Sequence, residues 1–371
     1  MKIGYEAKRI FHNKTGLGNY SRDLVRILST YYPSNTYFLY NPKPSDKNLF
    51  NPSTDNVQEL LPKIYLYKIF FNIWRQKGIV CDLKKDQVEI YHGLSGEIPL
   101  GIKRTPIKTI VTIHDLIFLR FPAFYSFFDR TIHFLKFKHA AKKADVIIDI
   151  SEQTKKDIVK FLKVEASKIK VVYQGCHADF KKEYSEEEKA TVLAKYQIPE
   201  SFILNVGTIE ARKNILSAVK AIQNIDTHLV IVGGKTNYTK QVMQYIKTHQ
   251  MEDKVSFLKG LTTKELAILY QSAQIFIYPS LFEGFGIPII EALYSKTPVI
   301  TSKKGCFSEA GGPHSVYVTP TDSREIAFHI RQLLSDKNLR NSITEKGFEY
   351  AQRFNDDVIA KEVHQIYQSL V

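Results

Sequence analysis

The 371-residue chain has few cysteines and lacks any long hydrophobic run. Its three cysteines, Cys81, Cys176 and Cys306, lie far apart in the sequence, which excludes both a disulfide framework and a Cys-x-x-Cys metal site. We therefore expect reduced thiols. No apolar stretch approaches the roughly 20 residues that a membrane-spanning helix needs. Residues 1–6 have the pattern of a strand and not of a secretory signal, so we expect a cytoplasmic protein.

A complete dinucleotide-binding fingerprint is also missing. Gly16 and Gly18 lie in a Gly-rich loop between a predicted strand, Lys2–Glu6, and a helix predicted from Tyr20 onward. The third glycine of the fingerprint is absent, and the next predicted strand ends at Asn41 without the acidic residue that binds a ribose. This argues against an NAD-dependent oxidoreductase or sugar epimerase. The two glycines would still let backbone N–H groups approach a phosphate, although an ordinary tight turn explains them equally well.

Charge of one sign dominates the chain, which carries 52 basic and 38 acidic residues and a formal net charge of +14. Such a protein attracts phosphates, whether in a nucleotide, a nucleic acid or an anionic membrane surface. The basic residues are scattered, and no basic recognition helix or aromatic RNA-binding signature occurs. Short lysine pairs are expected to form solvated faces: Lys84-Lys85, Lys142-Lys143, Lys155-Lys156 and Lys303-Lys304.

The order of predicted elements indicates two α/β domains. The chain is too long for one typical domain, and strands alternate with helices in both halves, as in parallel, doubly wound sheets. The pattern breaks between residues 175 and 201 into a charged stretch that contains Glu186-Glu187-Glu188 and that we interpret as a linker. We therefore predict an N-terminal domain over residues 1–178, a C-terminal domain over 190–355, and a final amphipathic helix over 356–371.

One segment of the N-terminal domain, between Pro42 and Gln87, has little periodicity and many aromatic residues. Within it, Tyr65–Trp74 is amphipathic, and its aromatic side chains fit either the core or a surface that faces an acceptor. We favour the core. Further along, a helix is predicted over about Phe137–Ala144.

Two carboxylates flank a Gly-rich loop in the second half of the chain. The β-branched run that ends at Tyr278 predicts a buried strand, and Pro288 marks the first turn of a following helix. Glu283 then lies in the loop, and Glu291 lies about one turn into the helix, near its positive end. Both would reach the carboxyl edge of a parallel sheet, where open α/β sheets bind ligands. Glutamates near helix starts also serve purely as caps, so either residue alone has an equally good structural explanation.

Two further groups follow predicted strands. Arg212 and Lys213 come after the first strand of the second domain, where two cations could neutralise a diphosphate, although an exposed Arg-Lys pair taken alone is more often ordinary surface. His114 follows a strand of the first domain, a place suited to polar contact with a ligand, although a structural histidine would look the same. No Asp-x-Asp triplet or cluster of His, Cys and Asp predicts a metal site.

The sequence Glu283-Gly-Phe-Gly-Ile-Pro-Ile-Ile-Glu291 resembles the Glu-x7-Glu motif of the retaining nucleotide-sugar glycosyltransferases of family 4, which have the GT-B fold. The loop from Val206 to Asn214 resembles the phosphate-binding loop of that family, with one departure: many members have Arg directly after the Gly, and here Thr208 occupies that position. The His-Asp pair at 114–115 is also typical of the family. The resemblance implies two Rossmann-like domains that face a central cleft. It also implies that the final helix, over residues 356–371, returns to the N-terminal domain.

The resemblance also implies a role for each motif residue. Lys213, with Arg212 as its companion, would bind the diphosphate, and Glu291 would hold the ribose hydroxyls. Glu283 and the backbone N–H groups of Phe285, Gly286 and Ile287 would hold hydroxyls of the transferred sugar. Gly16 and Gly18 would close over the diphosphate, and His114 would lie beside the donor sugar. The family members most similar in the Glu-Ala-Arg-Lys-Asn loop and the His-Asp-Leu sequence use GDP-mannose and extend surface polysaccharides.

We accordingly expect a retaining, metal-independent hexosyltransferase that has no cofactor beyond its nucleotide-sugar donor. Attack on the same face as departure is favoured, because no carboxylate is evidently placed as a nucleophile. The acceptor would be a saccharide or a lipid-linked saccharide, and the basic surface is compatible with peripheral contact with an anionic membrane. A nucleic-acid-binding protein would also explain the charge, but carboxylates beside the phosphate site would repel a polyanion.

Overall fold

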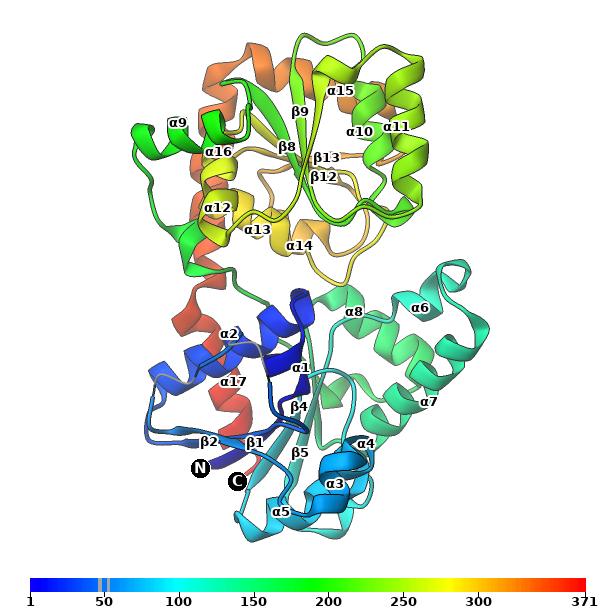
Figure 1. Cartoon of the computed structure of the whole chain (residues 1–371), viewed down its shortest axis with the longest axis vertical. Coiled ribbons are helices and arrows are strands. Elements are labelled where there is room, and N and C mark those ends of the chain that lie inside the picture. The colour runs from blue at the N-terminus through cyan, green and yellow to red at the C-terminus, as the bar shows by residue number, and fades with distance from the viewer. Residues whose placement is uncertain (46–48, 52–53) are drawn as a thin grey trace. The chain divides into compact units, whose positions relative to one another are not determined.

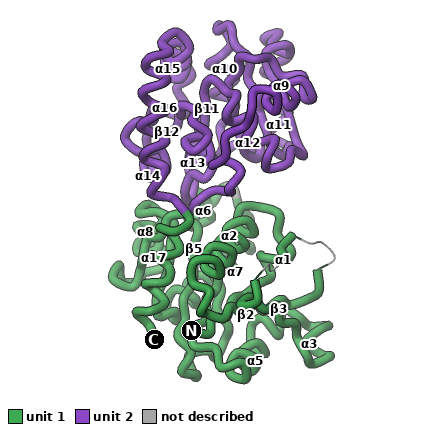
Figure 2. Tube along the Cα trace, turned by 90° about the vertical axis from the view of Figure 1, so that its left-hand side faces the viewer, with its two compact units in different colours: residues 1–174, 356–371 green, residues 175–355 purple. Residues whose placement is uncertain are grey.

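The computed structural model describes residues 1–45, 49–51 and 54–371, and the chain forms two compact units. Unit 1 comprises Met1–Gln174 together with Asp356–Val371, and unit 2 comprises Gly175–Asn355 (Figure 2). The first break therefore falls at Gln174, before the predicted domain end at residue 178. The C-terminal helix belongs to unit 1.

Unit 1 is built on a seven-stranded sheet in the order β3-β2-β1-β4-β5-β6-β7, and all of its strand pairs are parallel. The strands are β1 (Lys2–Glu6), β2 (Thr36–Tyr40), β3 (Val57–Leu60), β4 (Ile90–Gly93), β5 (Lys108–Ile113), β6 (Val146–Asp149) and β7 (Ile169–Val171). The helices are α1 (Lys8–His12), α2 (Gly16–Tyr31), α3 (Tyr65–Ile69), α4 (Phe71–Ile73), η1 (Trp74–Gly78), α5 (Ile79–Lys85), α6 (Ile117–Arg120), α7 (Phe127–Lys143), α8 (Glu152–Asp157), η4 (Ile158–Leu162) and α17 (Asp356–Gln368).

The sheet of unit 1 has a hydrophobic core on each face. Side chains of α2 and α17 fill one core, and side chains of η1, α5, α7 and η4 fill the other. The C-terminal helix α17 is fixed by the buried Tyr367, whose hydroxyl lies 3.0 Å from the Tyr5 hydroxyl and 2.7 Å from Nδ1 of His92. Figure 1 shows α17 beside α2, in red and blue, although nearly the whole chain separates them.

Unit 2 repeats this architecture with a six-stranded parallel sheet in the order β10-β9-β8-β11-β12-β13. The strands are β8 (Phe202–Val206), β9 (His228–Val232), β10 (Val255–Leu258), β11 (Ile275–Tyr278), β12 (Val299–Ser302) and β13 (Val316–Val318). The helices are α9 (Glu186–Lys195), η7 (Ala211–Lys213), α10 (Ile215–Ala221), α11 (Tyr238–Thr248), α12 (Thr263–Ser272), α13 (Ile287–Tyr294), α14 (Phe307–Gly311), α15 (Ser323–Ser335) and α16 (Lys337–Ala351).

The stretch interpreted as a linker is a helix, so that prediction was wrong. Ser185 and Glu188 form a capping box, in which the Ser185 side chain accepts from the Glu188 N–H and the Glu188 carboxylate accepts from the Ser185 N–H. The three consecutive glutamates lie in the first turn of α9, where negative charge is favourable. The acidic run therefore starts a helix of unit 2 and does not separate two domains.

Three other predictions differ from the structure. Helix α2 begins at Gly16 and not at Tyr20, and α7 begins at Phe127, ten residues before the predicted start, because Ser126 caps it by accepting from the Asp129 N–H. The aromatic segment Tyr65–Trp74 is not core as a whole. Trp74 is buried, but most of the other large side chains of this segment are exposed. No helix of the described residues is long and apolar enough to cross a membrane.

Candidate active site

The candidate site of unit 2 lies where the loops after β8 and β11 meet. These two strands are neighbours and run parallel, so their carboxyl ends stand at the same edge of the sheet. The loops are joined directly, since the Leu281 N–H donates to the Arg212 carbonyl oxygen at 2.8 Å. Arg212 and Lys213, from the turn η7, and Glu283, from the second loop, are thereby brought together as the sequence predicted for neighbouring loops.

Glu283 pairs with both cations. One carboxylate oxygen lies 2.6 Å from Nζ of Lys213, and the other lies 2.6 Å from Nη1 of Arg212. Arg212 also pairs with Glu210 at 2.6 Å and donates to the Phe282 carbonyl oxygen at 2.6 Å. Both cations therefore have anionic partners within the cluster.

Burial and charge act in opposite directions on these groups. Burial alone would raise the pKa of Glu283, but the adjacent Lys213 and Arg212 bring it below its usual range. Burial likewise works against the charged form of Arg212, yet Glu283 and Glu210 raise its pKa. Both shifts favour the charged forms of Glu283 and Arg212.

Tyr278 completes the cluster, and the sequence analysis assigned it no role beyond ending a strand. Its hydroxyl accepts from Nζ of Lys213 at 2.5 Å and donates to Glu283 at 3.1 Å. The Lys213 ammonium also lies over the Tyr278 ring, 4.9 Å from its centre. Burial is the main cause that raises the pKa of this hydroxyl, so it stays protonated and can hold both ions in place.

The loop after β8 has a backbone that requires glycine. Gly207 has φ of +148°, and a Cβ on Gly233 would lie 1.9 Å from the Gly207 carbonyl oxygen, so the two chain segments touch. Thr208 follows and is exposed. Lys213 passes close to Gly207, as a Cβ there would stand 3.5 Å from its Cε. The long lysine side chain thus runs along the Gly-rich turn.

Two residues to which the sequence gives no role at the site hold these loops together. Asn214 adopts a left-handed conformation with φ of 54°, and its amide donates to the carbonyl oxygens of Pro279 and Pro320 at 3.2 and 2.6 Å. The thiol of Cys306 donates to the carbonyl oxygens of Glu283 and Phe285 at 3.3 and 2.8 Å. Asn in a left-handed turn is a recognisable signal, whereas the thiol contact depends on tertiary folding.

Helix α13 carries the second glutamate. Gly286 precedes the helix, Pro288 lies in its first turn as predicted, and the N–H groups of a first turn have no partners within the helix. Glu291 accepts from the Tyr270 hydroxyl of α12 at 2.9 Å. Burial raises the pKa of Glu291 from its usual 4.5 to about 7, and the Tyr270 hydrogen bond opposes this shift. Phe285 is buried against Phe354, and Ile287 begins the helix.

The remaining predicted residues belong to unit 1. His114 follows β5, and both nitrogens of its ring have partners, since Nε2 lies 2.9 Å from the Leu94 carbonyl oxygen and Nδ1 lies 3.2 Å from the Gln174 amide. Burial lowers the pKa of His114 to about 4, so the ring is neutral and donates from Nε2. The Tyr20 ring meets it edge-on at 4.6 Å between centres.

Gly16 and Gly18 lie in the first turn of α2 and differ in what they require. A Cβ on Gly18 would lie 2.0 Å from the Asn13 carbonyl oxygen, so this position needs glycine. A Cβ on Gly16 would meet nothing within 4 Å. In the part of the chain that the structure describes, His, Cys, Asp and Glu side chains form no group of three or more suited to a metal ion.

Two family models match the chain, one in each half. Residues 187–350 match the glycosyl transferases group 1, and residues 56–180 match glycosyltransferase family 4. The O-antigen chain mannosyltransferase B of Escherichia coli is 26% identical over 387 residues and covers 100% of both chains. The O-antigen chain mannosyltransferase RfbU of Salmonella typhimurium is 33% identical over 217 residues, 58% of this chain and 57% of that one.

Solved structures share the fold over the full length. A sucrose-phosphate synthase from Thermosynechococcus elongatus has a TM-score of 0.80 at 20% identity and covers 100% of this chain and 99% of its own. The Anabaena protein HepE in complex with UDP has a TM-score of 0.78 at 18% identity, with 100% of both chains covered. These proteins therefore share the fold of this chain, in which each of the two units has a parallel, Rossmann-like sheet.

Proposed function

The chain belongs to the GT-B glycosyltransferases of family 4, and from this premise we propose that it transfers a mannosyl unit from GDP-mannose to a saccharide or lipid-linked saccharide acceptor. The product would be part of a surface polysaccharide. One observation supports the proposal above all: Arg212 and Lys213 form ion pairs with Glu283 at the carboxyl edge of the unit 2 sheet. Glu291 lies on the adjoining helix. The mannosyl unit is proposed because the O-antigen enzymes of the two bacteria are mannosyltransferases.

Donor binding begins, in this proposal, with an exchange of partners. Glu283 forms ion pairs with Lys213 and Arg212. A diphosphate brings stronger negative charge and more acceptor oxygens, so the two cations turn to it. The Glu283 carboxylate is then released to accept hydrogen bonds from the hydroxyls of the sugar. The same residues thus serve both halves of the donor, one after the other.

The nucleoside is held by Glu291. An ionised carboxylate accepts hydrogen bonds from two ribose hydroxyls, as acidic residues do in other nucleotide sites. The sugar would be oriented by the N–H groups of Phe285, Gly286 and Ile287 at the start of α13, and Thr208 would lie along the diphosphate. The resemblance also gives Gly16, Gly18 and His114 of unit 1 roles toward the donor, and these stay predictions that substitution of each residue tests.

We infer that chemistry proceeds with retention of configuration and without a metal ion. The acceptor hydroxyl would attack on the face from which the diphosphate leaves, and a donor phosphate oxygen would take its proton. The C1–O bond to the phosphate breaks, and the developing charge on the leaving diphosphate is stabilised by Lys213, Arg212 and the N-terminus of α13. Two positioned cations can supply several kcal/mol of transition-state stabilisation, on the order of the loss when one donor of an oxyanion site is removed.

Peripheral contact with an anionic membrane is part of the same proposal. A lipid-linked acceptor remains in the bilayer, so the enzyme must work at its surface. The formal charge of +14 favours that approach.

The proposal is tested by incubating the protein with GDP-mannose and a lipid-linked saccharide and by following the product with proton NMR. We expect an α-linked product from the α-linked donor and unchanged activity in EDTA. Lys213→Ala should abolish transfer, whereas Lys240→Ala, at an exposed site on α11, should leave it unchanged. Inversion of the anomeric centre, or loss of activity that Mg²⁺ restores, would disprove the mechanism.

A further inference from the structure

Unit 1 exposes far more large hydrophobic side chains than unit 2. Of the eighteen such side chains in the described residues, sixteen belong to unit 1, and only Met243 and Phe328 belong to unit 2, which has a similar size. Twelve of the sixteen fall in two short segments, 61–73 and 125–135. Single exposed hydrophobic residues are ordinary on a protein surface, but a concentration of them marks an interaction site.

The first segment contains α3 and α4. Its outer side chains include Tyr65, which is 76% exposed, and Leu66, Ile69 and Phe70, which are each more than half exposed. Lys63 and Lys68 lie among them, Arg75 and Lys77 follow the segment, and residues 61–81 contain no acidic residue. The segment is therefore apolar and basic at once.

Helix α7 has the same character. Phe127 and Phe128 at its start are 66% and 78% exposed, and Ile132 and Leu135 continue this face along the helix. Its five basic residues outnumber one acidic residue, and its last two positions are Lys142 and Lys143.

Both segments belong to the layer that covers one face of the unit 1 sheet. Tyr67 of the first segment and the adjoining Trp74 pack into the same hydrophobic core as three side chains of α7, Phe134, Phe137 and Ala140. The α2 and α17 helices pack on the other core, across the sheet. The exposed apolar residues thus lie on the outer side of the helices that cover one face of the sheet. We call this surface the docking face (residues 61–77 and 125–143).

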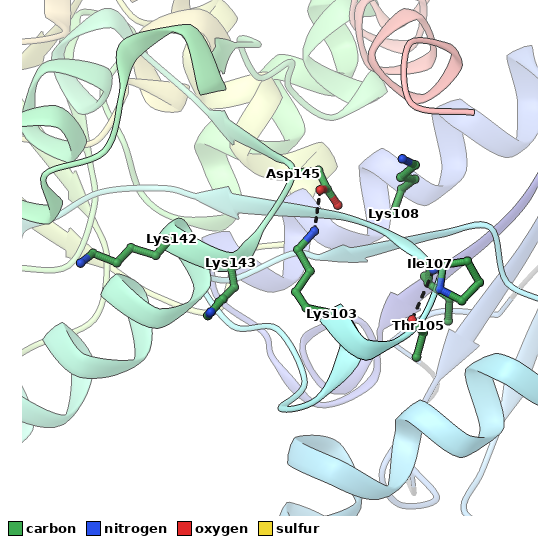
Figure 3. Close-up of a pocket in the computed structure, with 8 residues that line it drawn as sticks. Lys103, Thr105, Ile107, Lys108, Lys142, Lys143 and Asp145 are labelled. Carbon is green, nitrogen blue, oxygen red and sulfur yellow. Dashed lines mark hydrogen bonds and ion pairs between the residues drawn. The ribbon is translucent and has the colours of Figure 1, made fainter.

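A lysine-lined pocket adjoins the end of α7. This open pocket of about 470 Å³ is lined by Lys103, Lys108, Lys142, Lys143 and Asp145, together with Thr105, Pro106 and Ile107. Figure 3 shows that Lys103 points to Asp145, with which it pairs at 2.5 Å, while Lys142 and Lys143 extend away from that pair. Asp145 also accepts from the N–H and hydroxyl of Thr109, so it has only limited capacity to neutralise the other lysines. The pocket therefore offers cations to an anionic group.

We propose that the docking face binds the surface of a bilayer that contains anionic phospholipid, with the apolar side chains of α3, α4 and α7 in the interface and the lysine pocket against lipid phosphates. Residues 61–81 and α7 together contain nine basic residues and one acidic residue. Arg75 pairs with Glu6 and Lys136 pairs with Glu97, so seven basic residues lie outside these two ion pairs. An apolar surface whose charges are nearly all of one sign matches an anionic membrane. This proposal rests on the proposed function in one respect: the enzyme would encounter its lipid-linked acceptor at the bilayer surface.

The test is cosedimentation of the full-length protein with vesicles of phosphatidylcholine alone or mixed with phosphatidylglycerol. We expect the wild type to bind the mixed vesicles and to lose binding in high salt. A lysine near an anionic surface contributes about fivefold to binding, so Lys142→Glu with Lys143→Glu should weaken binding at least about 25-fold. Phe127→Ser with Phe128→Ser should weaken it by about tenfold or more. The matched controls, Phe328→Ser and Lys240→Glu with Lys247→Glu on exposed positions of unit 2, should bind like the wild type.

The inference would be overturned by no binding of the wild type to the mixed vesicles, by equal loss of binding in the control variants, or by a stable dimer that the Phe127/Phe128 variant dissolves. Binding of inorganic phosphate to the lysine pocket without vesicle binding would also overturn it and would indicate a site for free anions. Calorimetric titration with GDP separates this inference from the proposed function. The docking variants should bind GDP normally, and a wild type that binds vesicles but no nucleotide would refute the function while supporting the docking face.

Discussion

The raised pKa of Glu291 leads to opposite effects on stability and on ligand binding. Its pKa of about 7 lies above its usual 4.5, so the folded protein holds a proton that the unfolded chain releases. Stability from this group is present at low pH and is lost as pH rises from 4.5 to about 7. The shift corresponds to about 3 kcal/mol. Glu291→Gln, which keeps the Tyr270 hydrogen bond without the charge, should therefore stabilise unit 2 by up to about 3 kcal/mol at pH 8 and by much less at pH 5.

Nucleotide binding should change in the opposite direction. Only the ionised carboxylate accepts hydrogen bonds from both ribose hydroxyls, and its ionised fraction rises about tenfold between pH 6 and pH 8 for a pKa of about 7. The affinity of the wild type for GDP should rise by about the same factor, while the affinity of Glu291→Gln should be weaker and nearly independent of pH. Thermal unfolding at both pH values and calorimetric titration measure the two effects. An equal change in melting temperature at pH 5 and pH 8, or a GDP affinity of the wild type that does not vary, would refute this reasoning.

Three other predictions concern the residues around the site. Tyr278→Phe removes the hydroxyl between Lys213 and Glu283, which should lower the free energy of unfolding by about 1 kcal/mol in denaturant titrations. The same variant should have a raised KM for the donor. An unchanged KM would contradict the positioning role of Tyr278. Asn214→Ala loses two hydrogen bonds and strains a left-handed residue, so the free energy of unfolding should fall by about 2–3 kcal/mol. A fall of less than about 0.5 kcal/mol would show that the loops are held in place without Asn214. The His114 ring, with a pKa of about 4, should stay neutral from pH 5.5 to 8, and nitrogen NMR that shows it titrating near 6.5 would contradict the buried environment.

The sequence predicted the fold well because its signals are local. Strands of β-branched residues, such as Phe202–Val206 and Ile275–Tyr278, are buried on both faces and have little freedom to be anything else. The exceptions were also local. The charge of the acidic run at 186–188 favours a linker, but the Ser185 cap makes it the start of a helix, and the Ser126 cap starts α7 ten residues before the predicted position.

The site was only partly predictable. The sequence placed Arg212, Lys213 and Glu283 in loops and Glu291 in a helix at the carboxyl edge of a sheet, and the structure joins the first three in one ion cluster. That Glu283 is itself the partner of both cations depends on β8 and β11 being neighbours although about 70 residues separate the loops. The contribution of Tyr278 arises in the same way, since a strand residue at the end of β11 reaches the cluster only through the fold. The exposure of Tyr65 and Phe70 could not be deduced either, because amphipathic aromatic segments suit a core and a membrane surface equally.

A crystal structure of the protein with GDP-mannose would test the central claim most directly. The account predicts that Nζ of Lys213 leaves Glu283 for a diphosphate oxygen, that the freed Glu283 carboxylate contacts the mannose, and that Glu291 accepts from the ribose hydroxyls. A bound donor with Lys213 still paired to Glu283, or with its ribose away from Glu291, would contradict it.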